Sequence, residues 1–173
     1  NDLGDMSVEM DSGVKTISIS PIGQKAGITL STADSLTDNG TWSAGGNAIN
    51  LEADSNNFVA GSASLKFDIS AAGSSAYIQN STLTQIDATD YEDVGSLFIY
   101  AYIPSVTIIT SIEARWGSSS TDYNYRTVSA THDNTAFVVG WNLLRFDWAG
   151  SSETGTNIAS AQDYLRVTFN YDG

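Results

Sequence analysis

The strongest constraint on the fold is a series of short segments in which apolar and non-apolar side chains alternate. Each segment is bounded by Gly, Ser, Asn or Asp, which are typical turn residues. Alternation with a period of two buries one face of a strand and leaves the other face free, so the pattern predicts an all-β, antiparallel β-sandwich. The predicted strands are residues 63–69, 97–103, 112–116, 123–128, 143–148 and 165–171.

Composition restricts the partners of this chain. Its 173 residues are 41% hydrophobic, enough for one domain with a core. With 20 acidic and 7 basic residues the net charge is −13, which disfavours binding to nucleic acid or to an anionic membrane surface. No apolar run is long enough for membrane insertion, and Cys is absent. We therefore expect a soluble, extracellular or surface-exposed protein, secreted or part of a virion. Because it begins with Asn1 rather than Met, we interpret it as a piece of a longer chain.

Two regions of the chain differ in composition. Residues 1–31 contain one alternating stretch, VKTISI at 14–19, but few aromatic residues and little apolar mass. Such a segment cannot bury a core alone, so we interpret it as an extended arm or hairpin that packs on the main domain or on a protein partner. A flexible leader is the alternative. Residues 32–173 form the predicted main domain, with Ser-rich loops between its strands.

Several segments of the main domain together carry a family pattern. They are Trp42 after DNG at 38–40, GSASLKF at 61–67, SLFIYAYIP at 96–104, GWNLLRFDW at 140–148 and DYLRVTF at 163–169. In order and spacing they resemble carbohydrate-binding modules with a galactose-binding-like jelly roll. Such modules are appended to polysaccharide-degrading enzymes, and similar domains occur in phage and viral surface proteins. The resemblance implies a jelly-roll sandwich without catalytic activity, whose partner is a glycan or cell-surface polysaccharide.

The alternation also predicts which side chains face outward. On residues 97–103 the odd-numbered residues suit the core, so Tyr100 and Tyr102 face the other way. If the strands are neighbours in one sheet, the outward aromatic rings and charged groups line one surface, where rings match sugar C–H faces and charges hydrogen-bond hydroxyls. The alternative is solvated ion pairs, with the tyrosines packed on a loop or subunit. The predicted ligand-binding residues are Tyr100, Tyr102, Glu113, Arg115, Tyr125, Arg126, Arg145 and Asp147; on the strand of Tyr125 and Arg126 the inward side stays open.

An oxygen-rich loop, EADSNN at 52–57, precedes the GSASLKF segment. Calcium takes six to eight oxygen ligands, and in the resembled modules a structural calcium often lies where this loop meets the last strand. The resemblance therefore implies a structural Ca²⁺ held by Asp54, Asn57, Ser64 and Asp172. A plain acidic loop is the alternative, since the segment lacks a self-sufficient linear calcium motif.

Signs of catalysis are few. The single His, His132, stands in a turn-like sequence, and no G-x-S-x-G segment is present. Zinc is disfavoured by the absence of Cys and the single His. We therefore expect a non-catalytic glycan-binding module rather than an enzyme. The alternative function is a structural or adhesion module of a larger extracellular or virion assembly, in which the tyrosine surface is a subunit contact.

Overall fold

The computed structural model describes residues 27–70 and 73–172. The chain divides into two units, Asn1–Leu30 and Ser31–Gly173, and every strand of the described residues lies in the second unit. The alternating stretch at 14–19, and with it most of the predicted arm, lies outside the described residues. Its contact with a protein partner therefore stays a prediction.

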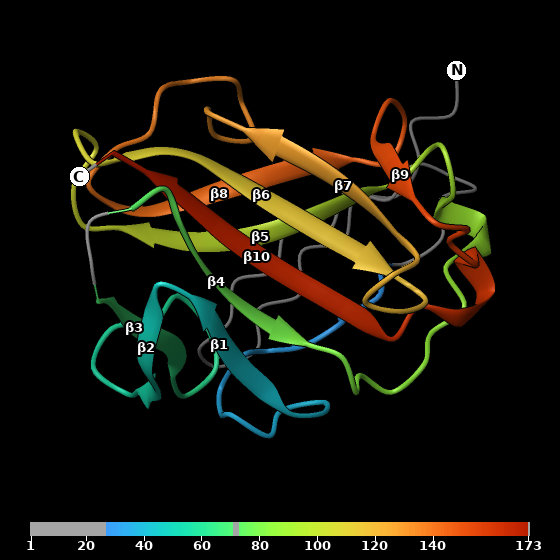
Figure 1. Ribbon diagram of the computed structural model, residues 1–173, viewed down its shortest axis with the longest axis horizontal. Coiled ribbons are helices and arrows are strands. Elements are labelled where there is room, and N and C mark those ends of the chain that lie inside the picture. Colours follow the sequence, from blue (N-terminus) through green and yellow to red (C-terminus); the bar gives the residue numbers. More distant parts are fainter. Residues whose placement is uncertain (1–26, 71–72, 173) are drawn as a thin grey trace, which may run out of the picture. The chain divides into compact units, whose positions relative to one another are not determined.

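Six strands form one antiparallel sheet in the order β1-β4-β10-β6-β7-β9. In Figure 1, β6, β7 and β10 pass in front of β5 and β8, so this sheet turns its outer face toward the viewer. The strands are β1 (Trp42–Gly46), β4 (Ser75–Asn80), β6 (Ile109–Gly117), β7 (Tyr123–Val128), β9 (Ser152–Thr154) and β10 (Tyr164–Tyr171).

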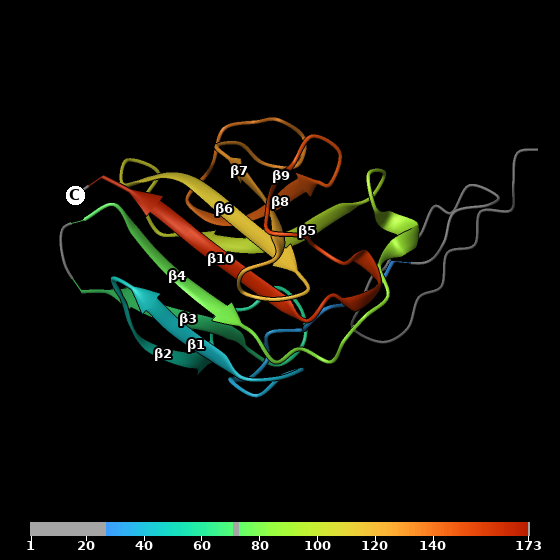
Figure 2. The same ribbon diagram turned by 45° about the vertical axis from the view of Figure 1, so that its right-hand side comes forward.

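The second layer consists of two antiparallel strand pairs. Strand β5 (Ser96–Ile103) pairs with β8 (Gly140–Asp147), and β2 (Ala48–Asp54) pairs with β3 (Ser64–Ile69). The β2–β3 pair lies beside β1, as Figure 2 shows. Two short 3-10 turns, η1 (Thr89–Tyr91) and η2 (Ala159–Ala161), complete the described elements.

The core lies between the two layers. Ile112 of the six-stranded sheet and Leu144 and Phe146 of β8 are fully buried, and burying a side chain of this size stabilises the fold by about 1.5–3 kcal/mol. Edge-to-face ring pairs connect the layers at two places. Trp116 meets Trp148 at 5.9 Å between ring centroids, and Phe67 of β3 meets Phe169 of β10 at 5.4 Å. The predicted all-β, antiparallel β-sandwich is confirmed.

All six predicted strands are present, with bounds that differ by at most three residues. The alternation holds within them as well: Ala101 is buried as predicted, and so, at every second or fourth position of the later strands and their ends, are Ile112 and Trp116, and Leu144 and Trp148. The alternation did not predict β1, β2, β4 and β9. Strand β1 contains two glycines and β9 has only three residues, all exposed, so neither presents an alternating apolar pattern.

Candidate functional site

The predicted single binding surface is wrong, because its residues lie on two different sheets. Tyr100, Tyr102, Arg145 and Asp147 are on β5 and β8, whereas Glu113 and Arg115 are on β6. All of these side chains point outward as predicted, but the outer faces of the two layers look in opposite directions. Two surfaces therefore replace the one that was expected.

The first surface is the outer face of the six-stranded sheet, which we call the tyrosine–arginine face. Strand register places its members on the same side of β4, β10, β6 and β7. None of these outward side chains is aliphatic. They are Ser75, Tyr77 and Gln79; Tyr164, Arg166, Thr168 and Asn170; Ser111, Glu113 and Arg115; and Tyr123, Tyr125 and Thr127.

Arg115 is held on this face by three contacts with two neighbours, Glu113 and Tyr123. Its Nε donates to Glu113 at 2.7 Å, its Nη1 donates to the Tyr123 hydroxyl at 2.9 Å, and its guanidinium carbon lies 4.9 Å from the centre of the Tyr123 ring. Burial alone would lower the pKa of Arg115, but the bond and charge of Glu113 outweigh it and leave the pKa raised. The Arg115 charge is thus fixed in position and balanced by a partner.

Arg166 stands directly opposite Arg115 in the β6–β10 register. Its guanidinium carbon lies 3.4 Å from the centre of the Tyr77 ring, and its Nε donates to the Thr168 hydroxyl at 3.2 Å. Within residues 27–70 and 73–172 no carboxylate lies at ion-pair distance from Arg166. The guanidinium is therefore oriented by neutral groups, and its charge is not balanced by a neighbouring acid.

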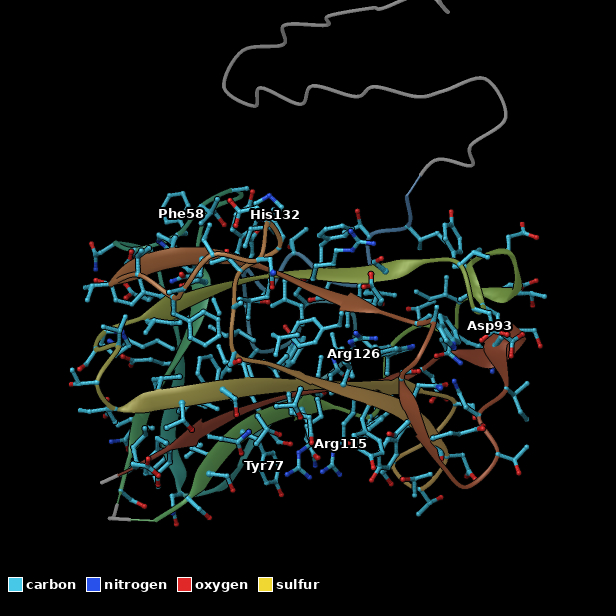
Figure 3. All side chains as sticks on the ribbon, turned by 90° about the horizontal axis from the view of Figure 1, so that it is seen from above. Phe58, Tyr77, Asp93, Arg115, Arg126 and His132 are labelled. Carbon is cyan, nitrogen blue, oxygen red and sulfur yellow. The ribbon has the colours of Figure 1, made fainter. Side chains whose placement is uncertain are left out.

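Gly45 makes room for this stack. It pairs with Tyr77 across β1 and β4, and a Cβ on Gly45 would lie 2.2 Å from a carbon of the Tyr77 ring. The ring therefore lies against the bare backbone of β1 on one side and carries Arg166 on the other. In Figure 3, Tyr77 and Arg115 lie together on the outside of the sheet, on the side away from β5 and β8.

Tyr164 and Tyr123 join the two arginines into one cluster. The ring of Tyr164 lies 5.9 Å from that of Tyr123, which is in turn 6.1 Å from Tyr125. Burial raises the pKa of Tyr164, although the charges of Arg166 and Arg115 and a hydrogen bond with Arg166 act to lower it. A neutral phenol thus lies next to both guanidinium groups.

The second surface is the outer face of β5 and β8, which we call the aromatic ribbon. Its members are Ser96, Phe98, Tyr100 and Tyr102 of β5, paired in register with Asp147, Arg145, Leu143 and Trp141 of β8. The three rings of β5 are well exposed, with 54% of Phe98, 53% of Tyr100 and 41% of Tyr102 accessible. Only Tyr102 has a ring partner in the described chain, Trp141 at 5.5 Å.

One end of the aromatic ribbon is polar. Arg145 Nε donates to Asp147 at 2.6 Å, and the Ser96 hydroxyl donates to the same carboxylate oxygen at 2.7 Å. The Ser96 bond lowers the pKa of Asp147, burial opposes it, and Arg145 lowers it further. Because half of the Arg145 side chain is exposed, water weakens this pair.

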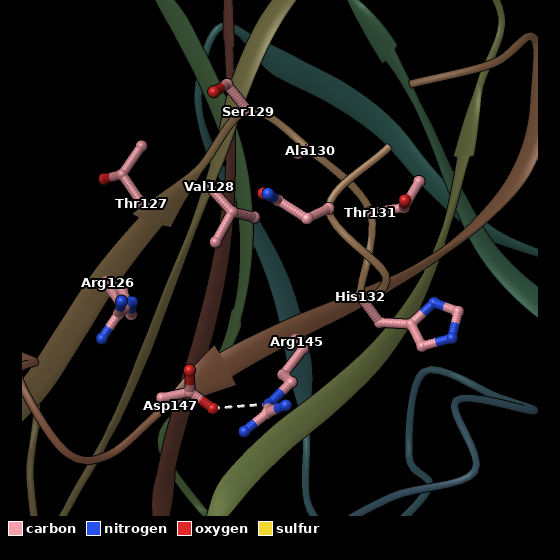
Figure 4. Close-up of a pocket in the computed structure, with 10 residues that line it drawn as sticks. Arg126, Thr127, Val128, Ser129, Ala130, Thr131, His132, Arg145 and Asp147 are labelled. Carbon is pink, nitrogen blue, oxygen red and sulfur yellow. Dashed lines mark hydrogen bonds and ion pairs between the residues drawn. The ribbon is translucent and has the colours of Figure 1, made fainter. Parts of the chain in front are cut away.

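A pocket of about 320 Å³ lies beside this polar end, between β7, β8 and the connection that joins them. Arg126 from β7 and Arg145 and Asp147 from β8 line it, as the close-up in Figure 4 shows. Arg126 is on the inward side of β7 and donates to the Ala149 carbonyl at 2.9 Å. The parity left open in the sequence is thus decided: Tyr125 faces outward and Arg126 inward.

The four predicted calcium ligands do not meet. Asp54, Asn57 and Ser64 lie at one end of the β2–β3 pair, where the Ser64 hydroxyl donates to the Asn57 carbonyl at 2.7 Å. Asp172 instead follows Tyr171, whose hydroxyl accepts a hydrogen bond from Asn47. Asn47 lies at the other end of the β2–β3 pair, and the length of β2 puts it roughly 20 Å from Asp54. The predicted four-residue site is therefore wrong, because the end of β10 lies at the opposite end of the β2–β3 pair. A structural Ca²⁺ at the remaining three residues stays a prediction.

Four residues of the tyrosine–arginine face are not among those predicted from the sequence: Arg166, Tyr77, Tyr123 and Tyr164. Arg166 could have been found, because the alternation of residues 165–171 already sets it on the face opposite Val167. Tyr77 could not, because its strand was not predicted. His132 is exposed in the β7–β8 connection, as expected of a loop residue, and its backbone N–H donates to the Leu143 carbonyl.

Comparisons with known proteins leave this site to be interpreted from its geometry. Neither a protein-family model nor a curated protein matches the chain. In the part of the chain that the structure describes, no three His, Cys, Asp or Glu side chains gather in a group able to hold a metal ion. No helix of the described residues has the length and hydropathy needed to cross a bilayer.

Proposed function

We propose that this domain is a non-catalytic glycan-binding module and that the tyrosine–arginine face is its binding surface. The observation that carries the proposal is the fixed Arg115–Glu113–Tyr123 cluster beside the Arg166–Tyr77 stack. The resemblance of the sequence to carbohydrate-binding modules supports the same function. Outside a cell or on a virion surface, such a module would meet polysaccharide, so we propose that location too.

A sugar presents apolar C–H patches and a ring of hydroxyl groups. Tyrosine rings complement the first, and charged or amide side chains hydrogen-bond the second. Pre-positioned side chains lower the entropic cost of binding, because fewer rotamers must be ordered when the ligand arrives. On the tyrosine–arginine face the contacts within the protein already hold Tyr77, Tyr123, Arg115 and Arg166 in place.

The test is calorimetric titration of the intact chain with a panel of neutral and acidic oligosaccharides. We expect at least one member to bind, and Tyr125→Ala to weaken that binding by about tenfold because an outward ring is lost. Tyr100→Ala, an equivalent truncation on the aromatic ribbon, is the matched control and should bind as the wild type does. Absence of binding to every member, or equal losses in both variants, would contradict the proposal.

One observation favours a second function, that of a structural module in a larger assembly. The aromatic ribbon exposes three large rings, and Val138 and Val139, which precede β8 at its Tyr102–Trp141 end, are 57% and 63% accessible. Exposed apolar side chains gathered on one side of a protein are typical of protein–protein contacts. In this case the aromatic ribbon, rather than the tyrosine–arginine face, would be the subunit contact.

The mass of the chain in solution, measured over a range of concentrations, tests this second function. A contact through the aromatic ribbon predicts self-association that Tyr100→Asp abolishes, because Tyr100 lies opposite Leu143 between Phe98 and Tyr102, and a charge at the centre of an apolar interface is costly to desolvate. Tyr125→Ala serves as the control and should leave the mass unchanged. A strict monomer at every concentration would argue against a contact between copies of this chain.

A further inference from the structure

The two central arginines of the tyrosine–arginine face are unequal in their surroundings. Arg115 and Arg166 are two of the four arginines in a chain of net charge −13, yet they stand directly opposite each other on neighbouring strands. Like charges in this position destabilise a strand pair. Arg115 has Glu113 as its counter-charge, whereas the contacts of Arg166 among residues 27–70 and 73–172 are with neutral groups, namely Thr168, Tyr164 and the Tyr77 ring.

An anion that bound at Arg166 would supply the missing counter-charge. A guanidinium presents its donors in a planar fork that matches the two oxygens of a carboxylate. The stack on Tyr77 fixes the plane of that fork, and the bonds to Thr168 and Tyr164 leave further N–H donors of the guanidinium to a ligand. The terminal nitrogens of Arg166 therefore remain the natural partners for a carboxylate.

The rest of the face favours a saccharide as the carrier of that carboxylate. Tyrosine rings, hydroxyls and the Gln79 amide surround Arg166, and no aliphatic side chain lies among the outward residues of β4, β10, β6 and β7. An acidic peptide would find tyrosine rings there but no aliphatic side chain against which to pack its own apolar side chains. Resting on the glycan-binding function proposed above, we infer that the tyrosine–arginine face selects a glycan whose units bear a carboxylate, and that Arg166 pairs with it.

The experiment compares acidic oligosaccharides with neutral counterparts of the same backbone. The probes are oligogalacturonate, oligomannuronate and oligoglucuronate, each beside the oligomer obtained by reducing its carboxyl groups. Titrated into the intact chain, at least one acidic oligomer should bind about tenfold or more tightly than its reduced form, as a charged hydrogen-bonded pair predicts. The preference should shrink with added salt.

Substitutions then locate the source of the preference. Arg166→Gln should bind the acidic and the reduced oligomer equally, whereas Arg145→Gln, which changes an arginine of the aromatic ribbon, should keep the wild-type preference. If Arg166→Gln binds neither oligomer, Arg166→Lys tests the inference instead. Lysine retains the positive charge, so this variant should retain part of the preference for the acidic oligomer. Thermal unfolding of each variant checks that it is folded.

The possible outcomes separate this inference from the proposed function. Equal binding of acidic and reduced oligomers by the wild type overturns the inference and leaves glycan binding intact. A preference that survives in Arg166→Gln, or one that Arg166→Lys loses completely, also overturns it. A Glu-rich peptide that binds as tightly as the acidic oligomer overturns the assignment to a saccharide. Binding of no oligosaccharide at all removes both proposals.

Discussion

The two outer faces of this sandwich use aromatic residues in different ways. On the tyrosine–arginine face the rings are joined to charged groups, as in the stack of Arg166 on Tyr77 and the bond from Arg115 to Tyr123. On the aromatic ribbon, Phe98 and Tyr100 are more than half exposed, and the one ring contact found there in the described residues joins Tyr102 to Trp141. The first face is organised before any ligand arrives, and the second offers apolar area. This difference is why we assign glycan binding to the first and a protein contact to the second.

The largest expected difference between the faces concerns their ion pairs. The Arg115–Glu113 pair has side chains that are 24% and 16% accessible, whereas those of the Arg145–Asp147 pair are 50% and 35% accessible. Removing the charge of Glu113 leaves a half-buried guanidinium without its partner, so Glu113→Gln should lower the free energy of unfolding by about 1.5–3 kcal/mol. Asp147→Asn should lower it by less than about 1 kcal/mol, because water screens an exposed pair.

Chemical denaturation of the two variants at neutral pH measures this difference. Because both substitutions conserve shape and remove one negative charge, each serves as the control for the other. Equal losses of stability would show that the two faces are equally solvated, which would break the contrast drawn from the structure.

The comparison also shows what a single sequence can and cannot predict. Alternation correctly sets Tyr100 outward and Ala101 inward, because side-chain direction depends only on the parity of positions along a strand. Which strands share a sheet depends instead on long-range pairing. Strand β6 follows β5 in the chain but pairs with β7 and β10, so Arg115 and Tyr100 lie in different layers.

The same limit explains the gaps in the predicted site. Tyr77 becomes a site residue only through its neighbours, Gly45 on β1 and Arg166 on β10, which are far from it in the sequence. Asp172 was grouped wrongly for the same reason. The pairing of distant strands decides which end of the β2–β3 pair lies near the end of β10. Local patterns carry the direction of a side chain but not its neighbours across the sheet.

A smaller effect should follow from filling the space at Gly45. In Gly45→Ala the new methyl group overlaps the outer end of the Tyr77 ring, which must shift and carry Arg166 with it. Because a ring can rotate away at a cost of about 0.5–1.5 kcal/mol, the fold should survive. In the wild type the Tyr77 ring displaces the side-chain NMR signals of Arg166. In Gly45→Ala these signals should move toward the values of a free arginine.

Ser43→Ala provides the control, since Ser43 lies on the same face of β1 but opposite Gln79 rather than Tyr77. Ser43→Ala should leave the NMR signals of Arg166 unchanged. The signals of Tyr100 and Phe98 should stay unchanged in both variants, because the aromatic ribbon lies on the other layer. Unshifted Arg166 signals in Gly45→Ala would mean that Tyr77 does not position Arg166.

The smallest expected effect is a difference in proton binding between the two layers. Asp147 has a lowered pKa, chiefly through the Ser96 hydroxyl, whereas burial raises the pKa of Asp163, which precedes β10. An unfolded Asp titrates near a pKa of about 3.9. The contribution of Asp147 to stability is therefore present above that pH and is lost as the pH falls through its folded pKa. The contribution of Asp163 is present below that pH and is lost as the pH rises through its folded pKa.

On acidification from neutral pH, Asp163 should thus take up a proton at a higher pH than Asp147 does. Carboxyl carbon chemical shifts, followed by NMR from pH 7 to pH 2, give both midpoints in one titration. Ser96→Ala should move the Asp147 midpoint upward and leave that of Asp163 in place, because the Ser96 hydroxyl bonds only the first of these carboxylates in the described structure. If Asp147 titrated at or above the pH of Asp163, the hydrogen-bonded end of the aromatic ribbon would not be formed in solution.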